Sequence, residues 1–278
     1  MKKITFFLIA IIAFATISFS QTNYPFKVGI TGDGKTPIIL IPGFSCSGDV
    51  WKETLKVLEP KYKCYTLTMA GFTGVKPDTA PNIKNWISGI AKYIEDEKLV
   101  KPIIIGHSIG GVMSEILAAD YPNLISKIIV VDAVPCLFAL SDSTYKAYEH
   151  PDCSFMVNYY KFYDTDKFRA SQKLAVTGLV KDSTKIDMIT EWAVNSDRKT
   201  LGEIFCQFRN TDIRSKISQI VCPALILLEP SFKGNAAINK QYENLKTAKF
   251  EYANKGLHFI MYDDTDWYLK EISSFLGN

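Results

Sequence analysis

The sequence predicts an α/β fold in which a mostly parallel sheet is covered by helices on both faces. Short runs rich in Ile and Val recur along the chain, and they are continuously apolar, as strands buried on both faces require. Stretches with helical spacing of apolar residues lie between these runs, and this alternation is typical of parallel sheets. The pattern is interrupted once, by a long segment without a convincing strand, which predicts an inserted group of helices.

The predicted elements follow one another with little connecting chain. Runs dominated by β-branched and aliphatic residues predict strands, and the last of them is the weakest: 37–41, 62–68, 102–105, 127–132, 223–228 and 249–253. Apolar residues recurring every third or fourth position predict helices at 50–59, 83–98, 111–120, 236–246 and 266–276. We therefore expect residues 21–134 and 219–278 to form one core.

Residues 135–218 are predicted to form a helical cap inserted into that core. The segment is too long for a loop, and it contains helical and aromatic-rich stretches instead of strands. Its large apolar side chains could line a pocket, although packing of the cap onto the core is the expected role for most of them. They are Phe138, Phe155, Met156, Tyr159, Tyr160, Phe162 and Tyr163.

The N-terminal segment has the layout of a secretory signal. Lys2 and Lys3 precede a long apolar stretch, and small residues lie just before Gln21. We expect cleavage between Ser20 and Gln21, so that the mature protein is exported to the periplasm or secreted. An uncleaved membrane anchor is less favoured, because the apolar run is short and lacks basic residues on its far side.

Charge and cysteine content narrow the range of partners. The 278 residues carry a formal net charge of only +3, which does not suggest nucleic acid or an anionic membrane as a partner. The six cysteines follow the predicted cleavage point, so disulfides are permitted, but the sequence does not determine their pairing. No CxxC spacing of a zinc or redox site occurs, and we expect no metal or cofactor.

A serine lies in a glycine-rich turn between a predicted strand and a predicted helix. The stretch IIIGHSIGG places Ser108 in the G-x-S-x-G pattern of a nucleophile elbow. Gly106 and Gly110 flank the serine because a β-carbon at either position would press on the neighbouring strand or helix. The pentapeptide alone is a weak signal, but its strand and helix context predicts a nucleophilic serine.

This chain resembles the α/β-hydrolase superfamily over nearly all of the predicted mature protein. The resemblance depends on IILIPGFSCSGDVW, LTMAGFTG, IIIGHSIGG, SQIVCPALIL and GLHFIMYDD. It implies that the backbone N–H groups of Phe44 and Ile109 form an oxyanion hole. Two fixed amides suit this role because they stabilise a developing oxyanion with little reorganisation.

A serine nucleophile requires a base, and the chain has three histidines. His107 is next to the serine, and we expect it to point elsewhere. His150 lies in the insertion, where a surface or turn position is expected. His258 precedes the terminal helix, in the loop that returns to the strand ends, and it matches the histidine of the related enzymes. We therefore predict His258 as the general base.

The acidic partner of this histidine is ambiguous, because no aspartate occurs between Asp212 and Asp263, where most related enzymes have theirs. Asp132 ends the strand next to the elbow strand, and some related enzymes use that position. Glu229 ends a later strand and is the alternative. We favour Asp132, although an aspartate there could also only cap the following loop.

These residues predict a serine hydrolase that cleaves a carboxylic ester through an acyl-enzyme. A lactonase, including one for acyl-homoserine lactones, is the alternative, and amide or C–C bond hydrolysis is compatible with the same residues. A small-molecule ester or lactone is the expected substrate. A non-catalytic ligand-binding protein is the alternative of another class, because a fold does not by itself establish catalysis.

Overall fold

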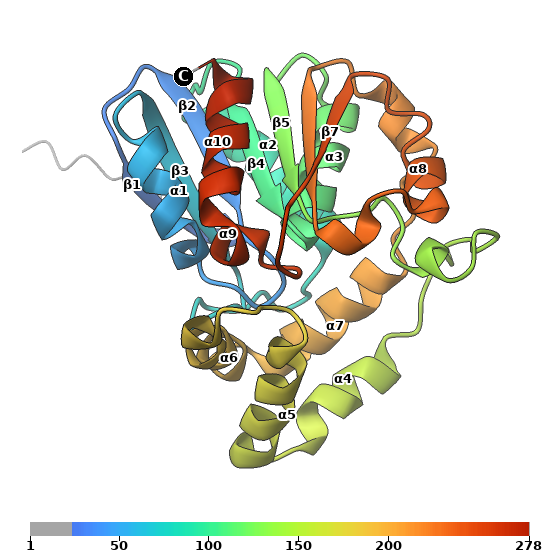
Figure 1. Cartoon of the computed structure of the whole chain (residues 1–278). Helices are drawn as coiled ribbons and strands as arrows, with labels where there is room; N and C mark the ends of the chain where they lie inside the picture. Colours follow the sequence, from blue (N-terminus) through green and yellow to red (C-terminus); the bar gives the residue numbers. More distant parts are fainter. Residues whose placement is uncertain (1–23, 278) are drawn as a thin grey trace, which may run out of the picture.

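A computed structural model of the chain describes residues 24–277 (Figure 1). Its centre is a seven-stranded sheet with the order β1-β3-β2-β4-β5-β6-β7. The strands are β1 (Phe26–Thr31), β2 (Thr36–Ile41), β3 (Tyr62–Met69), β4 (Ile103–His107), β5 (Lys127–Val131), β6 (Ala224–Leu228) and β7 (Ala248–Tyr252). The predicted signal segment, residues 1–20, lies outside the described residues.

All neighbouring strands are parallel except β1, which pairs antiparallel with β3. The mostly parallel sheet is therefore confirmed, and β4 and β5 lie side by side with His107 opposite Val131. Strand β1 was not predicted. Only Phe26 is buried in it, and Gly29 interrupts it, so this edge strand lacks the apolar run by which the other strands are recognised.

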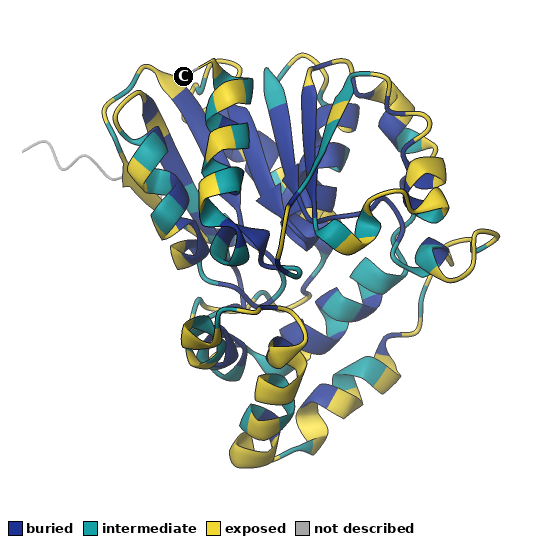
Figure 2. Ribbon diagram, viewed as in Figure 1, coloured by how far each residue is buried: buried dark blue, intermediate teal, exposed yellow. Residues whose placement is uncertain are grey.

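Helices cover both faces of the sheet (Figure 1). Residues of α2, α3 and α8 belong to the hydrophobic core on one face, and residues of α1, α9 and α10 belong to the core on the other. Figure 2 shows the strands as the buried centre, with exposed residues on the outer sides of the helices. The helices are α1 (Lys52–Leu58), α2 (Ile83–Asp96), α3 (Ile109–Asp120), α8 (Ala236–Gln241), α9 (Ile260–Asp263) and α10 (Thr265–Leu276). Helix α8 ends five residues before its predicted end.

Between β5 and β6, the described chain forms four α-helices and no strand. They are α4 (Ser154–Phe162), α5 (Thr165–Thr177), α6 (Ile186–Val194) and α7 (Arg198–Arg209), and they gather beyond one end of the sheet (Figure 1). Short 3-10 helices complete the structure at Gly48–Trp51, Phe138–Leu140, Ser183–Lys185, Lys216–Gln219 and Pro230–Phe232. We refer to residues 135–218 as the insertion.

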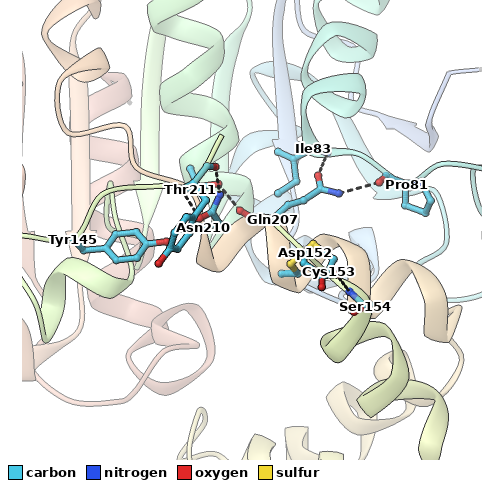
Figure 3. The surroundings of a disulfide bond; sticks show 11 residues. Pro81, Ile83, Tyr145, Asp152, Cys153, Ser154, Gln207, Asn210 and Thr211 are labelled. Atoms are coloured by element: carbon cyan, nitrogen blue, oxygen red, sulfur yellow. Dashed lines mark hydrogen bonds between the residues drawn. A yellow bond between two sulfur atoms is a disulfide. The ribbon is translucent and has the colours of Figure 1, made fainter. Parts of the chain in front are cut away.

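A disulfide joins two helices of the insertion. Cys153, at the start of α4, is bonded to Cys206 of α7, and the other four cysteines are buried free thiols (Figure 3). The next residue of α7, Gln207, accepts a hydrogen bond from the N–H of Ile83 and donates one to the carbonyl of Pro81. The disulfide therefore ties α4 to a helix that is itself attached to the core. Within residues 24–277, no helix has the length and apolarity needed to cross a bilayer.

Candidate active site

Ser108 forms the turn between β4 and α3. Its backbone has φ 55° and ψ −124°, which are the angles of the first central residue of a type II′ turn and are unfavourable for any residue except glycine. The backbone around Ser108 leaves no room for a side chain at the two flanking glycines. A β-carbon at Gly106 would lie 2.1 Å from the carbonyl oxygen of Gly110, and one at Gly110 would lie 2.3 Å from that of Ile41. The strained serine is thus held by close approach of the helix to the strands, as the sequence predicted.

His258 lies in the loop between β7 and α9. Hydrogen bonds from the residues on each side of His258 fix this loop. The N–H of Leu257 donates to the Asp263 carboxylate at 2.9 Å, and the N–H of Phe259 donates to the carbonyl of Leu179 at 3.0 Å. Asp263 also accepts hydrogen bonds from the N–H groups of Lys181 and Asp182, which lie between α5 and the 3-10 helix Ser183–Lys185. The same carboxylate therefore joins the histidine loop to the insertion.

The imidazole of His258 contacts Asp132, which follows β5. Asp132 Oδ2 lies 2.7 Å from His258 Nδ1, and Asp132 Oδ1 accepts a hydrogen bond of 2.8 Å from the N–H of Glu229. The aspartate is only 4% exposed and has φ 48°. Because a carboxylate accepts hydrogen bonds, this contact favours the tautomer with the proton on Nδ1 and leaves Nε2 free to accept a proton.

Glu229, the alternative acid, is directed to another partner. Its Oε1 accepts a hydrogen bond from the Ser231 hydroxyl, and its contact with Asp132 is through the backbone N–H. The structure therefore brings Asp132, and not Glu229, into contact with the imidazole. Both residues line the same cavity as Ser108 and His258.

The other two histidines differ sharply in environment. His150 is at the surface, where its side chain is 91% exposed, in agreement with the expectation for it. His107 does not point away from the site as expected: it lines the cavity, and its ring centroid lies 4.6 Å from that of His258. Its Nε2 lies 3.1 Å from the carbonyl oxygen of His258. Burial holds the pKa of His107 well below its ordinary value, and proximity to His258 lowers it further, so this ring is neutral.

The two amides predicted to form an oxyanion hole follow β2 and begin α3. Phe44 lines the cavity, and Ile109 directly follows Ser108 at the N-terminus of α3. Within the described residues, neither N–H donates to a protein acceptor. Both are therefore available to a ligand, and the helix N-terminus adds a favourable field for negative charge.

The cavity that contains these groups has a volume of about 650 Å³ and lies between the strand ends and the insertion. Of the seven apolar residues considered from the sequence, Met156, Tyr159 and Tyr160 line it. Phe155 and Phe162 neither line the cavity nor pack onto the core, because their side chains are 74% and 80% exposed. Further apolar lining residues, including Phe205 and Phe208 of α7, were not singled out from the sequence. Within the described residues, no group of three or more His, Cys, Asp or Glu side chains is arranged to hold a metal ion.

A family model described as "alpha/beta hydrolase fold" matches residues 36–180, which is more than half of the chain. The chain belongs to the α/β-hydrolase fold family. The region matched includes the nucleophile elbow and Asp132, whereas β6, β7 and His258 follow it in the chain.

Individual relatives of this α/β-hydrolase are distant. A pimeloyl-[acyl-carrier protein] methyl ester esterase from Proteus mirabilis is 21% identical over 202 residues, covering 70% of this chain and 74% of the relative. The Karrikin insensitive 2 receptor B of Petunia hybrida is 23% identical over 210 residues, covering 72% and 75%. The crystal structure of the enol-lactonase from Burkholderia xenovorans LB400 has a TM-score of 0.75 and 14% sequence identity, covering 91% of this chain and 96% of that one.

Proposed function

We propose that this protein is an exported serine hydrolase that cleaves a carboxylic ester through a Ser108–His258–Asp132 triad. The observation that carries the proposal is the 2.7 Å contact between His258 Nδ1 and Asp132 Oδ2 in the cavity that also contains the strained Ser108. The esterases among the relatives support hydrolytic activity.

In the proposed reaction, Ser108 Oγ attacks the ester carbonyl while His258 Nε2 accepts its proton. Asp132 keeps the Nδ1 proton in place and stabilises the imidazolium that forms. The N–H groups of Phe44 and Ile109 donate to the oxyanion of the tetrahedral intermediate. His258 then returns the proton to the departing alcohol, and water cleaves the acyl-enzyme by the same steps in reverse order.

The lining of the cavity indicates the kind of acyl group that it accepts. Aromatic and aliphatic residues predominate among the lining residues, and the volume of about 650 Å³ is in the usual range for small-molecule sites. A small or medium acyl ester suits such a cavity. A lactone presents the same carbonyl chemistry, and the enol-lactonase with the same fold supports it as an alternative substrate.

A fluorophosphonate probe and p-nitrophenyl butyrate test the proposal. The wild type is expected to be labelled and to hydrolyse the ester, whereas Ser108→Ala loses both properties. Ser171→Ala is the matched control, because Ser171 also lines the cavity but lies on α5. Labelling that persists in Ser108→Ala would contradict the assignment of the nucleophile. A panel of esters, lactones and amides then identifies the preferred bond.

A ligand receptor without turnover is the second candidate, and the relationship to the karrikin receptor favours it. This role predicts that hydrophobic ligands bind in the cavity while esters and lactones are not hydrolysed.

A further inference from the structure

The cavity contains a carboxylate that the proposed reaction does not use. Glu229 follows β6 and is half-buried in the cavity wall, next to Asp132 through its backbone N–H. Asp132 has a partner of complementary charge when His258 is protonated, but Glu229 forms no ion pair within the described residues. The compensating charge that acts on Glu229 from within the cavity is therefore that of His258 when this imidazole is protonated.

The rest of the cavity wall supplies no counter-charge. The residues that line it include Asp132 and Glu229 but no lysine or arginine from the described part of the chain. The hydroxyl of Ser231 donates a hydrogen bond to Glu229 Oε1, and no described residue donates to Oε2. Burial raises the pKa of the Glu229 carboxyl, and the Asp132 carboxylate adds to that rise, whereas the Ser231 hydrogen bond and the charge of His258 oppose it. An incoming cation or N–H donor would relieve this unfavourable position.

We propose that Glu229 is a specificity-determining residue that binds a cationic nitrogen of the substrate, so that the preferred esters carry an ammonium group. This inference rests on the proposed function, because it assigns a substrate class to the same cavity. The backbone of Glu229 is hydrogen-bonded to Asp132, so the ammonium group lies near the triad and not at the far wall formed by the insertion. An acyl chain ending in a carboxylate is disfavoured for the same reason.

Matched substrates measure this preference. Three p-nitrophenyl esters of equal acyl length, ending in a methyl, a trimethylammonium or a carboxylate group, are compared at mildly alkaline pH, which favours the ionised form of a carboxyl group whose pKa is raised. The wild type is expected to have a kcat/KM for the ammonium ester about 10-fold or more above that for the carboxylate ester, because Glu229 attracts the cation and repels the anion without a hydrogen bond.

Substitution of Glu229 distinguishes its contribution to the ammonium preference from that of the aromatic lining residues. Phe44, Phe205 and Phe232 also line the cavity, and aromatic faces attract cations, so a preference in the wild type alone is not sufficient. Glu229→Gln keeps these rings and is expected to lower the ammonium-to-carboxylate ratio about 10-fold, and Glu229→Lys is expected to reverse it. Glu243→Gln removes a carboxylate that is exposed and paired with Lys240, and it should leave the ratio at the wild-type value.

A binding measurement keeps this test independent of turnover. Calorimetry measures the affinities for pentyltrimethylammonium and for hexanoate in Ser108→Ala and in the double variant Ser108→Ala/Glu229→Gln. The ratio of the two affinities reports the ammonium-to-carboxylate preference without an ester. An unchanged ratio in Glu229→Gln, in both binding and kinetics, overturns the role of Glu229 and leaves the hydrolase assignment intact. A protein without esterase activity that still loses its ammonium preference in Glu229→Gln overturns the proposed function and supports the role of Glu229.

Discussion

At the scale of single residues, Asp132 is held so that each carboxylate oxygen has a separate partner. Oδ2 contacts His258 Nδ1, and Oδ1 accepts the N–H of Glu229. Its own N–H donates to the carbonyl of Leu227, which ties the residue to β6. An acid positioned in this way fixes the orientation and the tautomer of the imidazole.

Asp132→Asn is therefore expected to lower kcat for p-nitrophenyl butyrate by about a thousandfold or more, because an amide can stabilise the wrong histidine tautomer. The substitution is nearly isosteric, so circular dichroism should remain that of the folded protein. Glu229→Gln leaves the contact between Asp132 and His258 in place and serves as the comparison. A larger loss of kcat in Glu229→Gln than in Asp132→Asn would show that Glu229 is the acid.

The positions of Ser108 and His258 could be predicted because glycine spacing and the small number of histidines restrict the choices. The sequence favours Asp132 over Glu229 by strand-end placement alone, and it separates them weakly because both residues end strands of one sheet. The difference between them lies in the direction of the side chains, which depends on the backbone: Asp132 has φ 48°, whereas Glu229 has φ −64°. The packing of His107 against His258 depends on the loop after β7, and no local pattern indicates it.

At the scale of elements, helix α3 supports the nucleophile and buries a carboxyl group. Glu115 is fully buried, and its carboxyl oxygens have no hydrogen-bond partner within the described residues. The neighbouring hydroxyl of Tyr242 donates instead to the carbonyl of Ala133. Burial raises the pKa of Glu115 to about 8, and the proximity of Tyr242 opposes that rise slightly. The folded protein therefore keeps this group protonated at neutral pH.

Glu115→Gln is expected to change how stability depends on pH. Between pH 4.5 and 8 the folded state retains a proton that the unfolded state releases, so Glu115 lowers the free energy of unfolding as pH rises. The variant lacks this contribution, and its stability relative to the wild type should increase by up to about 1.4 kcal/mol per pH unit across that range. Urea unfolding at several pH values measures the difference. If the difference in the free energy of unfolding between the variant and the wild type is constant with pH, Glu115 does not take up a proton when the chain folds.

Elements buried on both faces were the ones that sequence patterns predicted well. Strands β2, β4, β5 and β6 each contain a continuous run of buried apolar residues, because helices cover the sheet on both sides. The exposed edge strand β1 carries no such pattern. In the insertion, α4 approaches α7 so closely that a β-carbon at Gly202 would lie 2.5 Å from Val157 Cα. This contact leaves Phe155 and Phe162 facing solvent, an arrangement that residue type alone does not indicate.

At the scale of the whole molecule, the insertion closes the cavity, and a disulfide holds part of it in place. Cys153 and Cys206 are separated by 53 residues, and the bond joins α4, which carries the cavity residues Met156 and Tyr160, to α7. A disulfide across such a loop contributes typically about 2–4 kcal/mol to stability. Disulfides form and persist in oxidising compartments, so this bond supports the proposed export of the protein.

Expression with the native N-terminus in a Gram-negative host tests export and oxidation together. We expect the protein in the periplasmic or secreted fraction, beginning at Gln21. Alkylation of the denatured, unreduced protein followed by mass spectrometry should leave only Cys153 and Cys206 unmodified. Reductant should lower the melting temperature of this form, because the unfolded chain regains the conformational freedom that the bond removes. The double variant Cys153→Ala/Cys206→Ala should melt at the lower temperature with or without reductant, since the remaining thiols are buried and unbonded. Protein that remains in the cytoplasm with residues 1–20 attached and both thiols reduced would contradict the export proposal, while leaving the geometry of Ser108, His258 and Asp132 unaffected.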